Sequence, residues 1–106
     1  MREAHKAVLS GMKVIDLSQM RTGAQVGQAL ADFGADVVHI EPPGGSSLRH
    51  EAAWPFWARG KRSIELNLKD AGDRDVAFSL GRQADVIIET FRPGVADRLG
   101  IGYVAL

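Results

Sequence analysis

Four short segments of the chain carry the spacing of apolar and polar residues that is typical of β-strands. They cover residues 12–17, 36–40, 61–68 and 84–88. Residues 61–68 alternate polar and apolar side chains, whereas the fourth segment ends in Val86, Ile87 and Ile88, which are all β-branched. An apolar run of this kind predicts a strand that is buried on both faces, as in a parallel sheet.

A first helix is predicted between the first two strands. Val26, Ala29, Leu30 and Phe33 recur at helical spacing, so they are expected to form the buried face of this helix. Gly34 follows them, and glycine tolerates the left-handed conformation in which many helices end.

A second helix is predicted between the third and fourth strands. Either Asp70 or Asp73 can cap its N-terminus, and the helix is expected to continue to about Arg82. Three residues are expected to face inward: Val76, Ala77 and Leu80.

Residues 46–60 have no clean period, so they are interpreted as a long loop with room for a helical turn. Loops of this length in compact domains are usually functional or mobile. Trp54, Phe56 and Trp57 lie in this loop. Two roles stay open for these aromatic residues: a plug over the core, or the lining of an apolar channel or partner surface.

The order β-α-β, loop, β-α-β predicts an α/β fold, with helices flanking a mostly parallel, Rossmann-like sheet. We expect residues 1–10 to be a flexible lead-in and residues 11–106 to form this domain. Residues 102–106 have the pattern of a further helix that has just begun. The domain is therefore expected to be incomplete within these 106 residues.

Composition narrows the classes of function. Thirteen basic and thirteen acidic residues balance to a formal charge of zero, which argues against general nucleic-acid binding. There is no cysteine, which excludes disulfides and thiolate metal sites and fits a reducing cytoplasm. No apolar run approaches the ~20 residues that a membrane-spanning helix needs. We therefore expect a cytoplasmic protein that does not bind membranes.

Basic residues follow two of the predicted strands. Lys69 comes after the third strand, and Thr90, Arg92 and Arg98 come after the fourth. Ligands of open α/β sheets bind at the carboxyl ends of the strands. Guanidinium groups and a hydroxyl in that place predict an anionic ligand, most simply a phosphate.

Other chemistries have weaker support. The turn after the first strand lacks the glycine spacing of a dinucleotide site, although Glu41 ends the second strand where a ribose-binding acid would lie. An exposed carboxylate is the simpler interpretation of Glu41. No serine lies in a nucleophile elbow, and no metal site is expected because His5, His39 and His50 are isolated.

Several motifs, in order along the chain, resemble the opening of the family III CoA-transferases. This is the superfamily of carnitine dehydratase, formyl-CoA transferase and α-methylacyl-CoA racemase. The matching motifs cover residues 11–18, 30–38, 41–45, 59–64, 66–69, 84–89 and 91–94, with Leu99-Gly100 and Gly102-Tyr103. The resemblance therefore extends over nearly the whole chain after residue 9.

The resemblance implies a Rossmann-like domain that binds acyl-CoA, and two chains that interlock as a homodimer. Position by position, it implies that the CoA site includes Arg21, Thr22, Leu66, Lys69, Thr90, Phe91, Arg92, Val95 and Arg98. Leu66 and Lys69 would meet the adenine and phosphate end. The residues from Thr90 onward would hold the ADP portion.

The chain departs from the family pattern at a few positions. Thr22-Gly23-Ala24 stands where Ala-Gly-Pro is usual, Pro42 replaces a frequent arginine and Thr90 a common asparagine. The family's catalytic residues, an aspartate nucleophile in the transferases and a histidine and aspartate in the racemases, lie downstream of Tyr103. No catalytic residue is therefore assigned here, and Asp16 and Asp32 are interpreted as strand-end and helix-surface groups. The alternative is a non-catalytic relative that serves as a binding or assembly module.

Overall fold

Four parallel strands form one sheet at the centre of the computed structural model, which describes residues 7–90. The strands are β1 (Lys13–Asp16), β2 (Asp36–Glu41), β3 (Lys61–Glu65) and β4 (Val86–Ile88). Their spatial order is β3-β2-β1-β4, and every neighbouring pair is parallel. The predicted α/β fold with a parallel sheet is confirmed.

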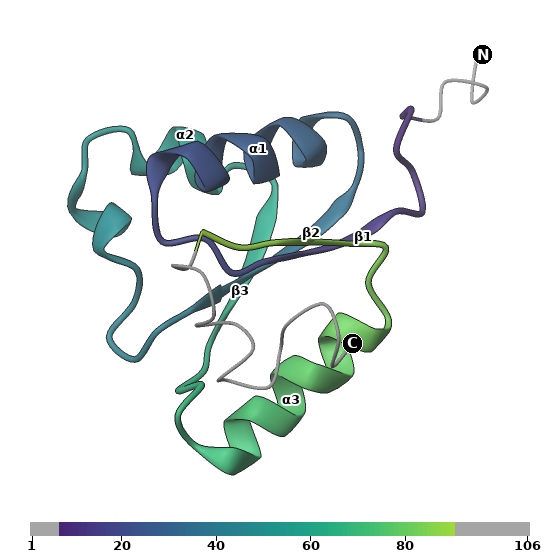
Figure 1. Ribbon diagram of the computed structural model, residues 1–106. Coiled ribbons are helices and arrows are strands. Elements are labelled where there is room, and N and C mark those ends of the chain that lie inside the picture. Colours follow the sequence, from purple (N-terminus) through teal and green to yellow (C-terminus); the bar gives the residue numbers. More distant parts are fainter. Residues whose placement is uncertain (1–6, 91–106) are drawn as a thin grey trace.

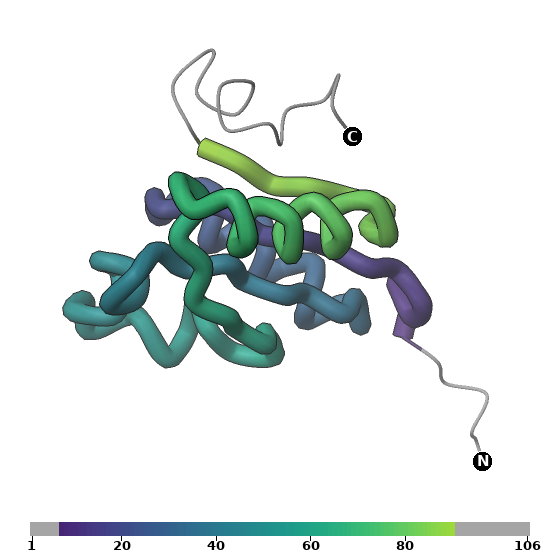
Figure 2. The backbone as a smooth tube through the Cα atoms, turned by 90° about the horizontal axis from the view of Figure 1, so that it is seen from below, coloured from purple at the N-terminus to yellow at the C-terminus, as the bar shows by residue number. Residues whose placement is uncertain are grey.

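Helices cover both faces of this sheet. α1 (Arg21–Asp32) and α2 (Trp54–Ala58) lie on one face and α3 (Ala71–Arg82) lies on the other (Figure 1). Figure 2, which views the molecule from below, shows α3 lying in front of the sheet and running roughly alongside β4. The chain thus changes sides after β3, and β4 returns to the far side of β1. The carboxyl ends of β1 and β4 therefore meet at a topological switch point.

The buried face of α1 differs from the prediction. Val26 is 49% exposed and Phe33 is 58% exposed. The helix instead buries Gly23, Ala24, Gly27 and Gln28. These residues are mostly small, so the helix backbone can approach the sheet closely. Leu30 packs against the core as predicted, whereas Val26 and Phe33 are left on the outer side.

The end of α1 follows the prediction. Gly34 has a φ of +102°, which favours glycine over residues with a side chain. Its N–H donates to the Ala31 carbonyl, and the Ala35 N–H donates to the Leu30 carbonyl. These two hydrogen bonds form a Schellman motif, which turns the chain back toward β2.

Residues 46–60 are more ordered than a long loop. They form η1 (Ser47–His50), a 3₁₀ helix, and then α2. Trp57 is buried in a cluster with Ala24 and Leu48, whereas Phe56 is 50% exposed. Trp57 therefore belongs to the core, where it packs against Ala24 of α1, whereas Phe56 remains accessible to a partner at the surface.

The prediction for α3 is correct except at one position. The Asp70 carboxylate accepts a hydrogen bond of 2.9 Å from the Asp73 N–H and caps the helix. Ala77 is buried and Leu80 packs on the core, but Val76 is 42% exposed. Val76 therefore faces solvent, contrary to the prediction.

Alternation along β1 and β2 divides the core into two clusters. Ile15, Leu17 and Ile40 pack toward α3, whereas Val14 and Val37 pack toward α1. The strand β4 adds Ile87 to the first cluster and Val86 and Ile88 to the second. All three β4 residues are only half-buried, not fully buried as predicted, because β4 is an outer strand of the described sheet.

No helix within residues 7–90 combines the length and the apolar character needed to cross a membrane. The same residues contain no group of three or more histidine, aspartate or glutamate side chains placed to hold a metal ion.

Candidate functional site

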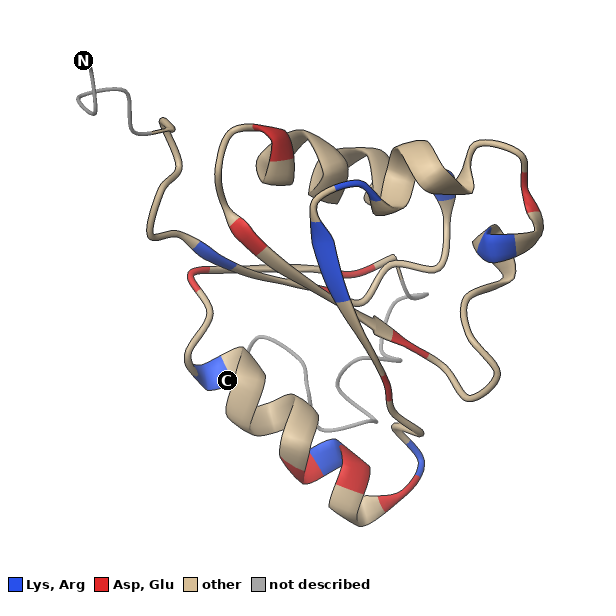
Figure 3. Ribbon diagram, turned by 180° about the vertical axis from the view of Figure 1, so that it is seen from behind, with Lys and Arg blue, Asp and Glu red and all other residues tan. Residues whose placement is uncertain are grey.

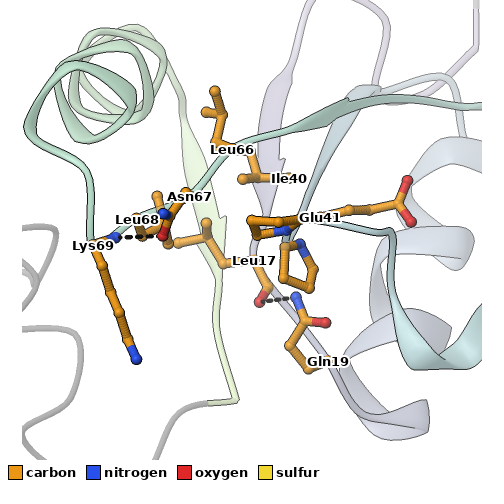
Figure 4. A pocket seen from close by; sticks show the side chains of 10 residues that line it. Leu17, Gln19, Ile40, Glu41, Leu66, Asn67, Leu68 and Lys69 are labelled. Atoms are coloured by element: carbon orange, nitrogen blue, oxygen red, sulfur yellow. Dashed lines mark hydrogen bonds between the residues drawn. The ribbon is translucent and has the colours of Figure 1, made fainter.

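A pocket of about 350 Å³ opens at the carboxyl ends of β1, β2 and β3 (Figure 4). We call it the strand-end pocket. It is lined by Leu17, Gln19, Ile40, Glu41, Pro42, Pro43, Leu66, Asn67, Leu68 and Lys69. Its place at one edge of a parallel sheet is the place where α/β folds bind their ligands.

The lining of the pocket is apolar at its base and polar at its rim. Leu17 follows β1, Ile40 lies near the end of β2, and Leu66 follows β3. All three belong to the core cluster that faces α3, so the strands hold them rigidly. Gln19 and Lys69 extend toward the same side of the pocket in Figure 4. An apolar base with a few polar groups around it suits a flat aromatic ring that carries a polar substituent.

Lys69 stands on an ordered turn. Its N–H donates to the Asn67 Oδ1 over 3.1 Å, and the Asn67 N–H donates to the Asp73 Oδ2 over 2.8 Å. Asp73 lies in the first turn of α3, so the start of that helix braces the turn. Within residues 7–90 the ammonium of Lys69 makes no ion pair, and the residue is exposed. It is the one cation among the ten pocket residues and is free to meet an anionic group.

The structure brings together only part of the predicted CoA site. Leu66 and Lys69 line the strand-end pocket, but Arg21, Thr22 and Thr90 do not. The predicted residues beyond Thr90 lie outside the described residues: Phe91, Arg92, Val95 and Arg98.

Arg21 and Thr22 open α1 at the surface. The Arg21 Nε lies 2.8 Å from the Glu51 Oε1, and the Arg21 side chain is 68% exposed. This contact ties the start of α1 to the segment between η1 and α2. Thr22 is exposed beside it.

Thr90 lies at the switch point between β1 and β4. Its Oγ1 accepts a hydrogen bond of 3.2 Å from the Gln19 N–H, and the Leu17 N–H donates to the Ile88 carbonyl over 2.7 Å. Lys69 and Thr90 thus share the carboxyl-end edge of the sheet, as predicted. They follow the two outer strands, however, and β1 and β2 lie between them.

Space is tight at the switch point. A Cβ added to Gly23 would lie 2.3 Å from the Ser18 Cβ and 2.9 Å from the Thr90 Cγ2. Glycine at the start of α1 is therefore what allows the turn after β1, the helix and the end of β4 to meet.

Glu41 is not the exposed carboxylate that was expected. It is 1% exposed, and its two oxygens accept hydrogen bonds of 2.6 Å from Nε and NH2 of Arg49. The Ser46 N–H donates a further hydrogen bond of 2.8 Å. The hydrogen bonds from Arg49, with that from Ser46, outweigh the effect of burial and hold the pKa of Glu41 at about 2, well below its usual 4.5.

The Glu41 carboxylate points away from the strand-end pocket (Figure 4), toward the face of the sheet that α1 covers. The carboxylate oxygens already accept hydrogen bonds from Arg49 and Ser46, so Glu41 is not placed to bind a ribose. Arg49 also lies over the Trp54 ring, with its guanidinium carbon 4.8 Å from the ring centroid. Glu41 and Arg49 thus hold the segment after β2 against the sheet.

A second group of buried polar residues lies beneath α1, and the sequence interpretation missed it. Asp16 is fully buried and its Oδ2 lies 2.8 Å from the Lys61 Nζ. Ser18 and His39 are also buried, and the His39 Nε2 lies 3.1 Å from the Ser18 carbonyl oxygen. Asp16 ends β1, as interpreted, and its side chain lies buried inside the α1–sheet interface.

One signal in the sequence could have found this group. Asp16 has the same strand parity as Val14, and His39 has the same parity as Val37. Polar residues that share a strand face with core valines are expected to be buried and partnered. Asp32, by contrast, is a helix-surface residue as predicted; its side chain is 40% exposed and pairs with Arg59.

Comparison with known proteins places these features in context. Residues 9–106 match the family model described as CoA-transferase family III. CoA-transferase/lyase DddD from Marinomonas sp. (strain MWYL1) is 44% identical over 106 residues, which are 100% of this chain and 12% of that protein. Acetyl-CoA:oxalate CoA-transferase from Acetobacter aceti is 44% identical over 110 residues, covering 95% of this chain and 28% of that protein.

Solved structures are similar over the same region. A crystal structure of Rv3272 from M. tuberculosis superposes with a TM-score of 0.89 at 36% identity, covering 95% of this chain and 29% of that one. A CAIB/BAIF family protein from Brucella suis gives a TM-score of 0.86 at 33% identity, covering 95% and 30%. The chain thus spans less than a third of the length of each of these proteins.

Proposed function

Because this chain belongs to CoA-transferase family III, we propose that its strand-end pocket binds the nucleotide end of CoA. The adenine ring would lie against Leu17, Ile40 and Leu66, and Lys69 would meet a phosphate. The observation that carries this proposal is that Leu66 and Lys69, which the family resemblance implies for the adenine and phosphate end, line one pocket.

The chemistry of the pocket supports this assignment. An adenine ring is flat and largely apolar on its faces, so it suits a base made of leucine and isoleucine side chains. Its edge carries hydrogen-bonding groups that Gln19 and Asn67 on the rim are able to pair. A phosphate can both pair its charge with the Lys69 ammonium and accept hydrogen bonds from it.

We further propose that acyl-CoA is the ligand of the whole protein. The names of the relatives describe CoA transfer, for example acetyl-CoA:oxalate CoA-transferase. Residues 7–90 would supply binding groups for such a ligand.

Replacing Lys69 with methionine tests the proposal. The variant keeps the apolar stem and removes the charge, so we expect CoA to bind about tenfold more weakly, the usual cost of a charge-assisted hydrogen bond at an exposed site. Isothermal titration calorimetry with CoA measures the change in Kd. Lys13→Met is the matched control, because Lys13 is an exposed lysine at the opposite end of the sheet, and it should leave Kd unchanged.

Two results would count against this function. One is the absence of binding at millimolar CoA by a folded sample. The other is an equal loss of affinity in Lys69→Met and Lys13→Met, which would indicate only a general effect of charge.

The outer face of α1 supports a second role, in assembly. Val26 on α1, Phe33 at the C-cap of α1 and Phe56 on α2 are each about half exposed. The helices α1 and α2 are neighbours in the fold, and a surface that exposes several large apolar side chains is typical of one that another protein covers. We propose that this face mediates self-association of the protein.

Phe33→Ser is expected to shift the protein toward monomer, because it replaces a large exposed apolar side chain of the proposed interface with a polar one. Analytical ultracentrifugation measures the change in the sedimentation coefficient. Val76→Ser is the control: Val76 is 42% exposed but lies on α3, on the other side of the sheet. A wild-type protein that sediments as a clean monomer at all concentrations would refute self-association.

A further inference from the structure

The buried ion pair between Asp16 and Lys61 connects two strands that do not touch. Lys61 begins β3 and is in register with Val37 of β2, which in turn is in register with Val14 of β1. The Lys61 side chain therefore crosses β2 to reach Asp16 near the end of β1. The basic segment at the start of β3 lies directly beneath α1 in Figure 3.

A glycine in α1, Gly27, leaves the space that this ion pair occupies. A Cβ added to Gly27 would lie 2.6 Å from the Asp16 Oδ2 and 3.0 Å from the Lys61 Nζ. The Lys61 Nζ also lies 3.2 Å from the Ala24 carbonyl oxygen, to which it donates. One ammonium thus holds the end of β1 and the first part of α1 at the same time.

The other oxygen of Asp16 holds the turn after β1. The Asp16 Oδ1 accepts hydrogen bonds of 2.9 Å from the Ser18 N–H and 2.5 Å from the Ser18 Oγ. The next residue is Gln19, whose side chain lines the strand-end pocket and whose N–H donates to Thr90. The hydrogen bonds therefore run without a break from Lys61 through Asp16 to Ser18, and the chain continues directly to the pocket rim.

Stability alone does not account for a buried ion pair. Removing two charges from water costs about as much as their attraction returns, so an apolar pair of similar size is often as stable or more stable. What the carboxylate does supply is direction, since its two oxygens fix Lys61 on one side and the Ser18 turn on the other.

We propose that Asp16 and Lys61 are positioning residues that set the turn at residues 17–20 for CoA binding. Neither side chain lines the strand-end pocket; they act through Ser18 and Gln19. This inference rests on the proposed function of the pocket. It adds a part of the site that lies beneath α1, on the opposite face of the sheet from the core cluster that forms the base of the pocket.

The test is the double variant Asp16→Asn/Lys61→Met, which removes both charges and nearly keeps both shapes. We expect it to fold, and to bind CoA about tenfold more weakly than the wild type, because methionine donates no hydrogen bond to the side chain at position 16 or to Ala24. Amide hydrogen exchange is expected to quicken at Ser18 and Gln19 specifically. The matched control is Asp32→Asn/Arg59→Met, which neutralises an exposed ion pair at the other end of α1 and should change neither measurement.

The outcomes separate the two proposals. If the wild type binds CoA and the folded double variant binds it with the same Kd, the positioning role is overturned. If the wild type does not bind CoA, the proposed function fails, whereas faster exchange at Ser18 and Gln19 would still support the anchoring of the turn and unchanged exchange would refute it. If the double variant does not fold, Ser18→Ala provides a second test, because it removes one hydrogen bond to Asp16 without leaving a buried charge unpaired. We expect this variant to bind CoA about threefold more weakly than the wild type. Wild-type affinity in Ser18→Ala would overturn the proposal.

Discussion

Lys61→Met is expected to lower the free energy of unfolding by about 3–5 kcal/mol, because it leaves the Asp16 carboxylate buried without its partner. The two side chains are 3% and 0% exposed, so water does not replace the lost ammonium. Urea denaturation followed by circular dichroism measures the change as a shift of the unfolding midpoint.

The neighbouring residue provides the control for this prediction. Arg62 pairs with Asp36, but their side chains are 70% and 49% exposed. Arg62→Met is therefore expected to cost less than about 1 kcal/mol, as is usual for exposed ion pairs. Equal losses in Lys61→Met and Arg62→Met would show that burial does not set the strength of the Asp16–Lys61 interaction.

Glu41 is expected to contribute about 2–3 kcal/mol of stability at neutral pH and to lose it in acid. The hydrogen bonds from Arg49 and Ser46 lower the pKa of Glu41 from 4.5 to about 2 in the folded protein. A lowered pKa stabilises the fold above the ordinary value, so this contribution is complete above pH 4.5 and disappears as the pH falls toward 2. We expect somewhat less than the full shift implies, because the Arg49 side chain is 44% exposed and solvent screens it.

The measurement compares the wild type with Glu41→Gln at a series of pH values. The difference in unfolding free energy should be greatest near pH 6–7 and shrink steadily below pH 4.5. Asp36→Asn, which removes a carboxylate from an exposed pair, should differ from the wild type by less than about 1 kcal/mol throughout. A Glu41→Gln difference that does not vary with pH would contradict the assignment of this stability to the charged carboxylate.

Local sequence patterns predicted most of the fold because residue type and spacing determine where the backbone forms strands, helices and turns. The four strands, the N-cap of α3 at Asp70 and the turn at Gly34 that follows α1 can be predicted from residue type and spacing within a few positions. Element ends were less accurate: β3 stops at Glu65 and not at residue 68, because after Glu65 the chain turns toward the cap of α3.

Side-chain environments were harder to predict than elements. The apolar spacing of Val26 and Phe33 correctly indicated a helix but the wrong buried face. Small residues on the opposite side, Gly23 and Gly27 among them, pack more closely on the sheet than large ones would. Helical periodicity identifies which residues share a face, and only packing decides which face turns inward.

The amino-acid sequence by itself determined the α/β class, the parallel strands, the family resemblance and the nomination of Leu66 and Lys69, since each depends on short-range pattern or on motifs in register. The tertiary structure alone decided that these two residues share a pocket with Gln19, that Glu41 is buried in an ion pair with Arg49, and that Lys61 reaches Asp16 across β2. The physical reason is the same in each case. Burial and ion pairing depend on distances between segments far apart in the chain, and those distances exist only once the strands have taken the order β3-β2-β1-β4.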